Sequence, residues 1–151
     1  MRTPLRIVSI LTLAGAVAGG RGVYTQSVSR EDLGDRADRL WRTCRELDAG
    51  GDTVAGMATC DALLVVLRQL GPSADKHLVA TLDWLGSAAE RIGDYKRAQG
   101  YEEQTSAPLD RVTKPGDWRR TGNRLHLERL RQILARPEAE RKALAEAERQ
   151  Q

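Results

Sequence analysis

Two cysteines are the side chains of this 151-residue sequence best placed for a covalent role. Cys44 and Cys60 lie sixteen residues apart and at equal distances from Asp52, in the middle of an expected turn. Residues equidistant from the turn of an antiparallel helix hairpin face one another. We therefore prefer a disulfide bond between them, with two buried free thiols as the alternative. Closing so short a loop would stabilise the hairpin by roughly 3 kcal/mol.

The remaining residues do not form a recognisable catalytic or metal-binding pattern. Nucleophilic catalysis needs a serine or cysteine beside a histidine and a third orienting group, and no short motif supplies them. We expect His77 to be a solvated residue at the start of a helix. His126 lies between two leucines, and we expect it to pack against its neighbours. The two histidines belong to different helices, and no glycine-rich phosphate motif occurs. We expect no enzymatic activity, no cofactor and no metal.

The first eighteen residues have the layout of an export signal. Arg2 and Arg6 precede a weakly polar run from Ile7 to about Gly20, which is shorter than the roughly 20 residues that span a bilayer. Residues 16–18, Ala-Val-Ala, fit a small-x-small cleavage site. We expect residues 1–18 to be a signal peptide or, if uncleaved, a signal anchor, with a flexible tether over residues 19–30.

Export has consequences for location and charge. The protein would be periplasmic or secreted, or held at the inner membrane if the signal is retained, and both places favour disulfides. The membrane would then be a partner only through the retained N-terminal segment. Cleavage removes two arginines and lowers the formal charge from +3 to +1. Overall basicity is therefore no argument for nucleic acid, which is not an expected partner.

Composition and periodicity favour an all-α fold. Ala, Leu, Arg and Glu dominate, Phe is absent and aromatic residues make up 4% of the chain, so strand formers are scarce. Apolar residues recur at the three- and four-residue spacing of helices with one buried face. These runs cover residues 33–47, 54–70, 78–92, 95–112 and 118–134. Glycine, proline and aspartate separate them, and Pro137 opens a last helix over residues 138–151.

The first four runs form a repeat of two helix hairpins. Gly51-Asp52 and Gly93-Asp94 are the same turn signal, 42 residues apart. At this offset apolar positions match apolar ones and small positions match small ones. The matching pairs are Leu40 with Leu82, Cys44 with Gly86, Gly56 with Ala98, and Leu67 with Leu109. Such recurrence indicates stacked helix hairpins. The run at 118–134 fits this register poorly.

Residues 82–104, LDWLGSAAERIGDYKRAQGYEEQ, resemble a tetratricopeptide repeat. Leu85-Gly86, Gly93-Asp94-Tyr95 and Ala98 stand at the spacing which that family uses for close helix packing. The 42-residue period resembles the kinesin-light-chain type of the repeat. The resemblance covers roughly residues 33–134, and it implies an α-solenoid fragment of stacked antiparallel hairpins over 31–134. It also implies that residues 135–151 are a C-terminal helix that starts a further repeat.

The resemblance further implies a concave surface lined by the first helix of each hairpin. The residues that it places there are Asp38, Trp41 and Arg45 in the first hairpin and Asp83, Ser87, Glu90 and Arg91 in the second. A tryptophan on a groove gives a large contact area at little cost in conformational entropy. Trp41 is the foremost candidate, although it could equally fill the interface with a preceding helix.

A basic segment follows the repeats. Between Arg111 and Arg136 eight cationic residues stand against two anionic ones, with Trp118 beside them. The segment could be a patch for anionic partners. We favour a solvated helix face, because the arginines encircle the expected helix rather than follow one stripe.

These observations predict a non-enzymatic module that binds a protein or peptide at the cell envelope. The alternative is a structural N-terminal segment that caps a longer repeat array or a linked domain and has no ligand of its own. About two and a half repeats are present where roughly three are needed for stability. Self-association, or a continuation of the array, would make up this shortage.

Overall fold

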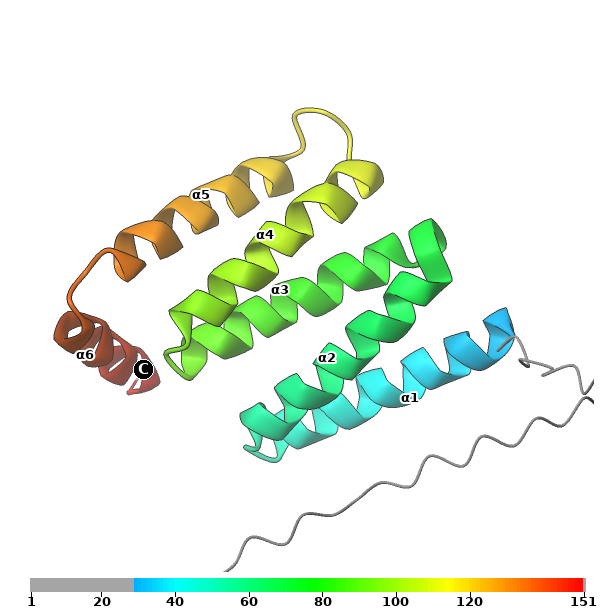
Figure 1. Cartoon of the computed structure of the whole chain (residues 1–151), viewed down its shortest axis with the longest axis horizontal. Coiled ribbons are helices and arrows are strands. Elements are labelled where there is room, and N and C mark those ends of the chain that lie inside the picture. The colour runs from blue at the N-terminus through cyan, green and yellow to red at the C-terminus, as the bar shows by residue number, and fades with distance from the viewer. Residues whose placement is uncertain (1–28, 151) are drawn as a thin grey trace, which may run out of the picture.

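The computed structural model describes residues 29–150, apart from the side chains of Glu148 and Arg149, and every regular element in this range is helical (Figure 1). The all-α prediction is confirmed for these residues. The predicted signal at 1–18 and residues 19–28 of the predicted tether lie outside them. The last two residues of that tether prediction are wrong, because Ser29 caps a helix that begins at Arg30. The elements in chain order are α1 (Arg30–Ala49), α2 (Thr53–Leu70), the 3-10 helix η1 (Gly71–Ala74), α3 (Asp75–Arg91), α4 (Tyr95–Val112), α5 (Trp118–Leu134) and α6 (Glu138–Arg149).

Local sequence sets the point at which helix α1 begins. Ser29 precedes the helix in an extended conformation, and its side chain accepts a hydrogen bond from the backbone N–H of Asp32. The Asp32 carboxylate in turn accepts one from the Ser29 backbone N–H, 3.2 Å away. This capping box satisfies two backbone donors that a helix start leaves unpaired. Helix α1 therefore begins at Arg30, three residues before the first apolar residue of its periodic run.

The turns that join α1 to α2 and α3 to α4 have the same geometry. Gly51 and Gly93 have φ angles of 87° and 81°, a left-handed conformation that glycine adopts without steric cost. Asp52 and Asp94 follow, and the carboxylate of each accepts a hydrogen bond of 3.0 Å from the backbone N–H three residues later. The 42-residue recurrence thus reflects two equivalent helix starts.

Successive helices from α1 to α5 pack against one another as the chain runs back and forth (Figure 1). Small residues allow the closest approach: a Cβ atom added at Gly56 of α2 would lie 3.1 Å from the backbone oxygen of Cys44 in α1. Ala98, at the equivalent position in α4, is fully buried. The core between the helices is apolar, with Met57, Leu82 and Leu85 wholly inside it. Burial of these side chains drives the packing.

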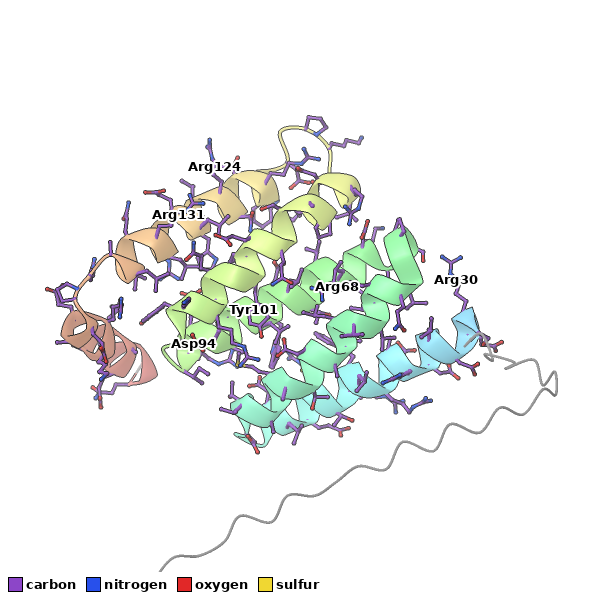
Figure 2. All side chains as sticks on the ribbon, in the orientation of Figure 1. Arg30, Arg68, Asp94, Tyr101, Arg124 and Arg131 are labelled. Carbon is purple, nitrogen blue, oxygen red and sulfur yellow. A yellow bond between two sulfur atoms is a disulfide. The ribbon has the colours of Figure 1, made fainter. Side chains whose placement is uncertain are left out.

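A polar network joins α4 to α2. The Tyr101 hydroxyl donates to Asp61, with an oxygen–oxygen distance of 2.8 Å, and accepts from Arg97 at 2.7 Å. Arg97 also pairs with Asp61. Tyr101 lies on the side of α4 that faces α2 (Figure 2). These contacts hold the second helix of one hairpin against the second helix of the other.

The stretch Thr53–Arg91 is the one helical run among residues 29–150 with the length and hydropathy of a membrane span. It comprises α2, η1 and α3, and buried core helices pass the same test. Gly71, with a φ angle of 72°, and Pro72 interrupt it, so that α3 turns back and packs against α2.

Helix α6 packs on the end of the second hairpin. It contacts α3, and Ala145 lies against the turn at Gly93, where an added Cβ atom would be 2.8 Å from the Ala145 Cβ atom. Ala145 is buried there. Gly93 therefore has two roles: it adopts the left-handed conformation of the turn, and its lack of a side chain leaves room for α6.

Candidate functional site

The two cysteines meet between α1 and α2. The Sγ atoms of Cys44 and Cys60 are 2.20 Å apart, which is disulfide distance, and both residues are fully buried in the core. Their separation along the hairpin explains the meeting, since each lies eight residues from Asp52. The covalent bond remains a prediction that the redox state of the purified protein will decide.

A hollow of about 380 Å³ opens between α1 and α3, with α2 beneath it. Ligand pockets span roughly 300–1,000 Å³, so its size suits one or two side chains or a small ligand. Asp38 and Trp41, two of the predicted groove residues, line it. The full lining comprises Gly34, Ala37, Asp38, Trp41, Leu63, Leu67, Leu70, Ser73, Ala74, His77, Ala80 and Thr81.

Trp41 contacts both the core and the hollow, and no helix precedes α1 among the described residues. Trp41 is half-buried, it packs against the apolar core, and it also forms part of the wall of the hollow. The Arg45 guanidinium lies 5.7 Å from the centre of the Trp41 ring, within range of a cation–π contact. Arg45 itself is exposed and does not line the hollow. The first-hairpin candidates thus lie together, with Arg45 at the outside.

The second-hairpin candidates lie apart from this hollow. Arg91 pairs with Asp48 of α1 at 2.7 Å and thereby ties the ends of α3 and α1 together. Ser87 is exposed on α3. Asp83 and Glu90 belong instead to a polar cluster with α4 and α5. The seven residues that the family resemblance placed on one surface are therefore divided between the hollow with its outer edge, an ion pair, a polar cluster and, for Ser87, the exposed surface of α3.

The polar cluster is centred on His126 of α5. Its Nε2 atom lies 2.6 Å from the Glu90 carboxylate of α3, and its Nδ1 atom lies 3.2 Å from the Glu102 carboxylate of α4. Arg129 also pairs with Glu90. The Asn123 amide donates to the Glu102 carboxylate at 2.7 Å and to the Glu102 backbone oxygen at 3.1 Å. Through these contacts α5 is held to both helices of the second hairpin.

Two pKa values in the cluster are shifted upward. The pKa of His126 is raised by its hydrogen bond to Glu102 and by the charge of that carboxylate, against the opposing effect of burial. The pKa of Asp83 is raised to about 6, first by burial of its carboxyl group and then by the neighbouring Glu102. A carboxylate faces each ring nitrogen, and only an imidazolium can donate to both carboxylates. The Arg129 guanidinium also lies 3.0 Å from Nε2, and its positive charge opposes protonation of the ring. The arrangement is that of a clamp rather than of a general base with a free nitrogen.

Sequence reasoning did not single out Glu102, which is buried although it is charged. A signal for it exists in the sequence. Glu102 falls on the helical stripe of Ala98, Thr105 and Leu109, where an apolar residue is expected. Gly86 provides the space, because a Cβ atom added there would lie 3.0 Å from Glu102 Oε1.

The basic segment is largely engaged in ion pairs with the protein's own carboxylates. Five of its eight cations pair in this way: Arg111 with Asp75, Arg119 with Asp117, Arg120 with Asp110, Arg129 with Glu90 and Arg131 with Glu128. Trp118 is 77% exposed at the start of α5.

Three of the basic residues of α5 line one hollow. Arg124 and Arg131 lie along the same helix (Figure 2) and, with Arg120, line a shallow hollow of about 260 Å³ beside α4. Positions 120, 124 and 131 fall within one helical face, whereas Arg119 and Arg129 fall on other faces of α5.

Within residues 29–150 no group of three or more His, Cys, Asp or Glu side chains is arranged to hold a metal ion. No family model matches the sequence, and neither a curated protein nor a solved structure matches it.

Proposed function

We propose that this chain is an exported, non-enzymatic module of tetratricopeptide type that binds a protein or peptide segment in the hollow between α1 and α3. The observation that carries the proposal is the hollow itself. Its floor is apolar, Trp41 forms part of its wall, and small residues such as Gly34, Ala37 and Ala80 keep it open. An apolar recess with an aromatic wall and a few polar groups is the usual form of a binding site.

The two equivalent turns support the proposed repeat type. Gly51-Asp52 and Gly93-Asp94 agree in φ angle and in capping contacts, and small residues occupy the close-packed positions in both hairpins. If the hairpins are repeats of this family, α1 and α3 are their first helices. These are the two helices that frame the hollow.

Export is supported by the sequence of residues 1–18 and by the cysteine pair. A pair at disulfide distance in a fully buried position suits an oxidising compartment such as the periplasm or the cell exterior. The hollow also favours a binding module over the alternative of a structural segment without a ligand, because a purely structural array has no need of an open recess.

Selection from a random peptide display library tests the proposal. The purified protein is the target, and a Gly34→Phe variant is the counter-target. A Cβ atom at Gly34 meets no atom of the neighbouring elements within 4 Å, and Gly34 lines the hollow, so we expect the phenyl ring to occupy part of it. Gly100→Phe is the matched control, because Gly100 is also in a helix, also has open space around it and does not line the hollow.

The proposal predicts peptides that bind the natural protein and the Gly100→Phe variant but not the Gly34→Phe variant. Peptides that bind all three proteins equally would place recognition elsewhere on the surface. Failure to select any peptide that depends on the hollow would refute the proposed function.

A further inference from the structure

The shape of the α1–α3 hollow limits what can enter it. Leu63 and Leu67 of α2 form an apolar floor, and the walls carry Ala37, Trp41 and Ala80. At about 380 Å³ the hollow has room for a large side chain but not for a helix or a folded element. A segment that lies across α1 and α3 would therefore insert one aromatic or large aliphatic side chain between them.

The hydroxyl groups in the lining are already engaged. Ser73 donates to the backbone oxygen of Leu70 at 3.1 Å, and Thr81 donates to that of His77 at 2.8 Å. At the Ser73 end Arg30 reaches across from α1, and its guanidinium donates to the Leu70 oxygen at 3.1 Å. These contacts fix the lining and leave its hydroxyl donors committed to the protein's own backbone.

Asp38 is the carboxylate of the hollow. Asp38 lies on α1, one turn before Trp41, and is exposed to solvent. Among residues 29–150 Asp38 has no hydrogen-bond or ion-pair partner, although Arg42 stands one turn after it on α1. Two other arginines of α1 are turned to other contacts. Arg30 bonds to the Leu70 oxygen and Arg45 stacks on Trp41. The rim of the hollow therefore presents one negative charge that a ligand can neutralise.

On the basis of the proposed function, we infer that the ligand is a peptide segment with a large apolar side chain directly next to a lysine or arginine. The apolar side chain enters the hollow beside Trp41, and the adjacent cation pairs with Asp38 at the rim. A carboxylate at the same ligand position would meet Asp38 as a like charge. An exposed charge pair of this kind contributes more to the choice between ligands than to the affinity for any one of them.

The experiment uses three blocked model peptides that differ at two positions: Gly-Ser-Gly-Phe-Lys-Gly-Ser, the same peptide with Glu for Lys, and the same peptide with Ala for Phe. Binding to isotope-labelled protein is followed by the NMR signal of the Trp41 indole N–H, assigned by Trp84→Phe and Trp118→Phe. Asp38→Asn removes the charge. Asp35→Asn is the matched control, because Asp35 is also exposed on α1 but does not line the hollow.

We expect the Phe-Lys peptide to bind roughly five-fold more tightly than the Phe-Glu peptide, as exchange of one exposed attractive pair for a repulsive pair allows. Asp38→Asn should abolish this difference, Asp35→Asn should keep it, and the Ala-Lys peptide should not shift the Trp41 signal. Equal binding of the Phe-Lys and Phe-Glu peptides, or a difference that survives Asp38→Asn, would overturn the inference. So would the absence of any shift at Trp41. The display selection with Gly34→Phe judges the proposed function separately, so the two can fail independently.

Discussion

Replacement of His126 by glutamine should destabilise the fold at acidic and neutral pH and should remove part of its pH dependence. In the natural protein the imidazole bridges Glu90 of α3 and Glu102 of α4, at 2.6 and 3.2 Å. His126 can donate both hydrogen bonds only when its ring is protonated. Glutamine keeps hydrogen-bonding groups at this position but has no charge, so both glutamates lose a charge-assisted contact.

The cost follows from these contacts. Hydrogen bonds to charged groups contribute about 1.5–3 kcal/mol each. The His126 side chain is 29% exposed, and both glutamates keep another partner, Arg129 for Glu90 and Asn123 for Glu102. Solvent screening and these remaining partners reduce the loss. We expect His126→Gln to lower the unfolding free energy by about 2 kcal/mol at pH 6.

The direction of the pH dependence follows from the raised pKa of His126. A histidine whose pKa is higher in the folded state stabilises the fold fully below its unfolded pKa of about 6.5 and loses this effect as the pH rises through the folded value. The unfolding free energy should therefore fall above pH 6.5. Asp83 acts in a lower window, because its pKa is raised from 3.8 to about 6 and its stabilising protonation is lost between these values.

Urea unfolding followed by circular dichroism at pH 6, 7.5 and 9 measures the effect. The natural protein and His126→Gln should differ most at pH 6 and converge by pH 9. His77→Gln is the matched control, since this exposed histidine starts α3 outside the cluster, and its pH profile should follow that of the natural protein. A constant difference between the natural protein and His126→Gln at all three pH values would refute the proposed clamp.

Two further predictions concern the hairpins. The Cys44→Ala/Cys60→Ala double variant should lose roughly 3 kcal/mol, the chain-entropy value for a sixteen-residue separation, and calorimetry should show a melting temperature lower by about 10–15 °C. Two free thiols in non-reducing mass spectrometry of the natural protein would contradict the bond. Gly93→Ala should cost more than Gly51→Ala in urea unfolding. Both place a side chain at a positive φ angle, at about 1 kcal/mol, but only Gly93 would press on Ala145 of α6. Equal losses would mean that α6 does not pack on this turn.

The sequence predicted the helices well because periodicity and turn chemistry are local. Gly51-Asp52 and Gly93-Asp94 mark each helix boundary through a left-handed glycine and a capping carboxylate, and both properties belong to single residues. The meeting of Cys44 and Cys60 was also predictable, because a tight turn fixes the register of the two helices that it joins.

The polar cluster was not predictable in the same way. His126 lies 36 residues from Glu90 and 24 from Glu102, so its partners depend on how α5 packs on the second hairpin. Arg91 was placed on a groove by family resemblance, yet it pairs with Asp48 across 43 residues. Such assignments depend on distances between helices, which spacing along one helix does not determine. The hollow beside Trp41 likewise needs α1, α2 and α3 together.

The most direct test of the peptide-binding proposal is an experimental structure of the protein with a display-selected peptide. The account predicts that one large side chain of the peptide lies against Trp41 between α1 and α3, above Leu63 and Leu67. A peptide bound elsewhere, for example along α5 beside Arg124, with the hollow between α1 and α3 unoccupied, would contradict it.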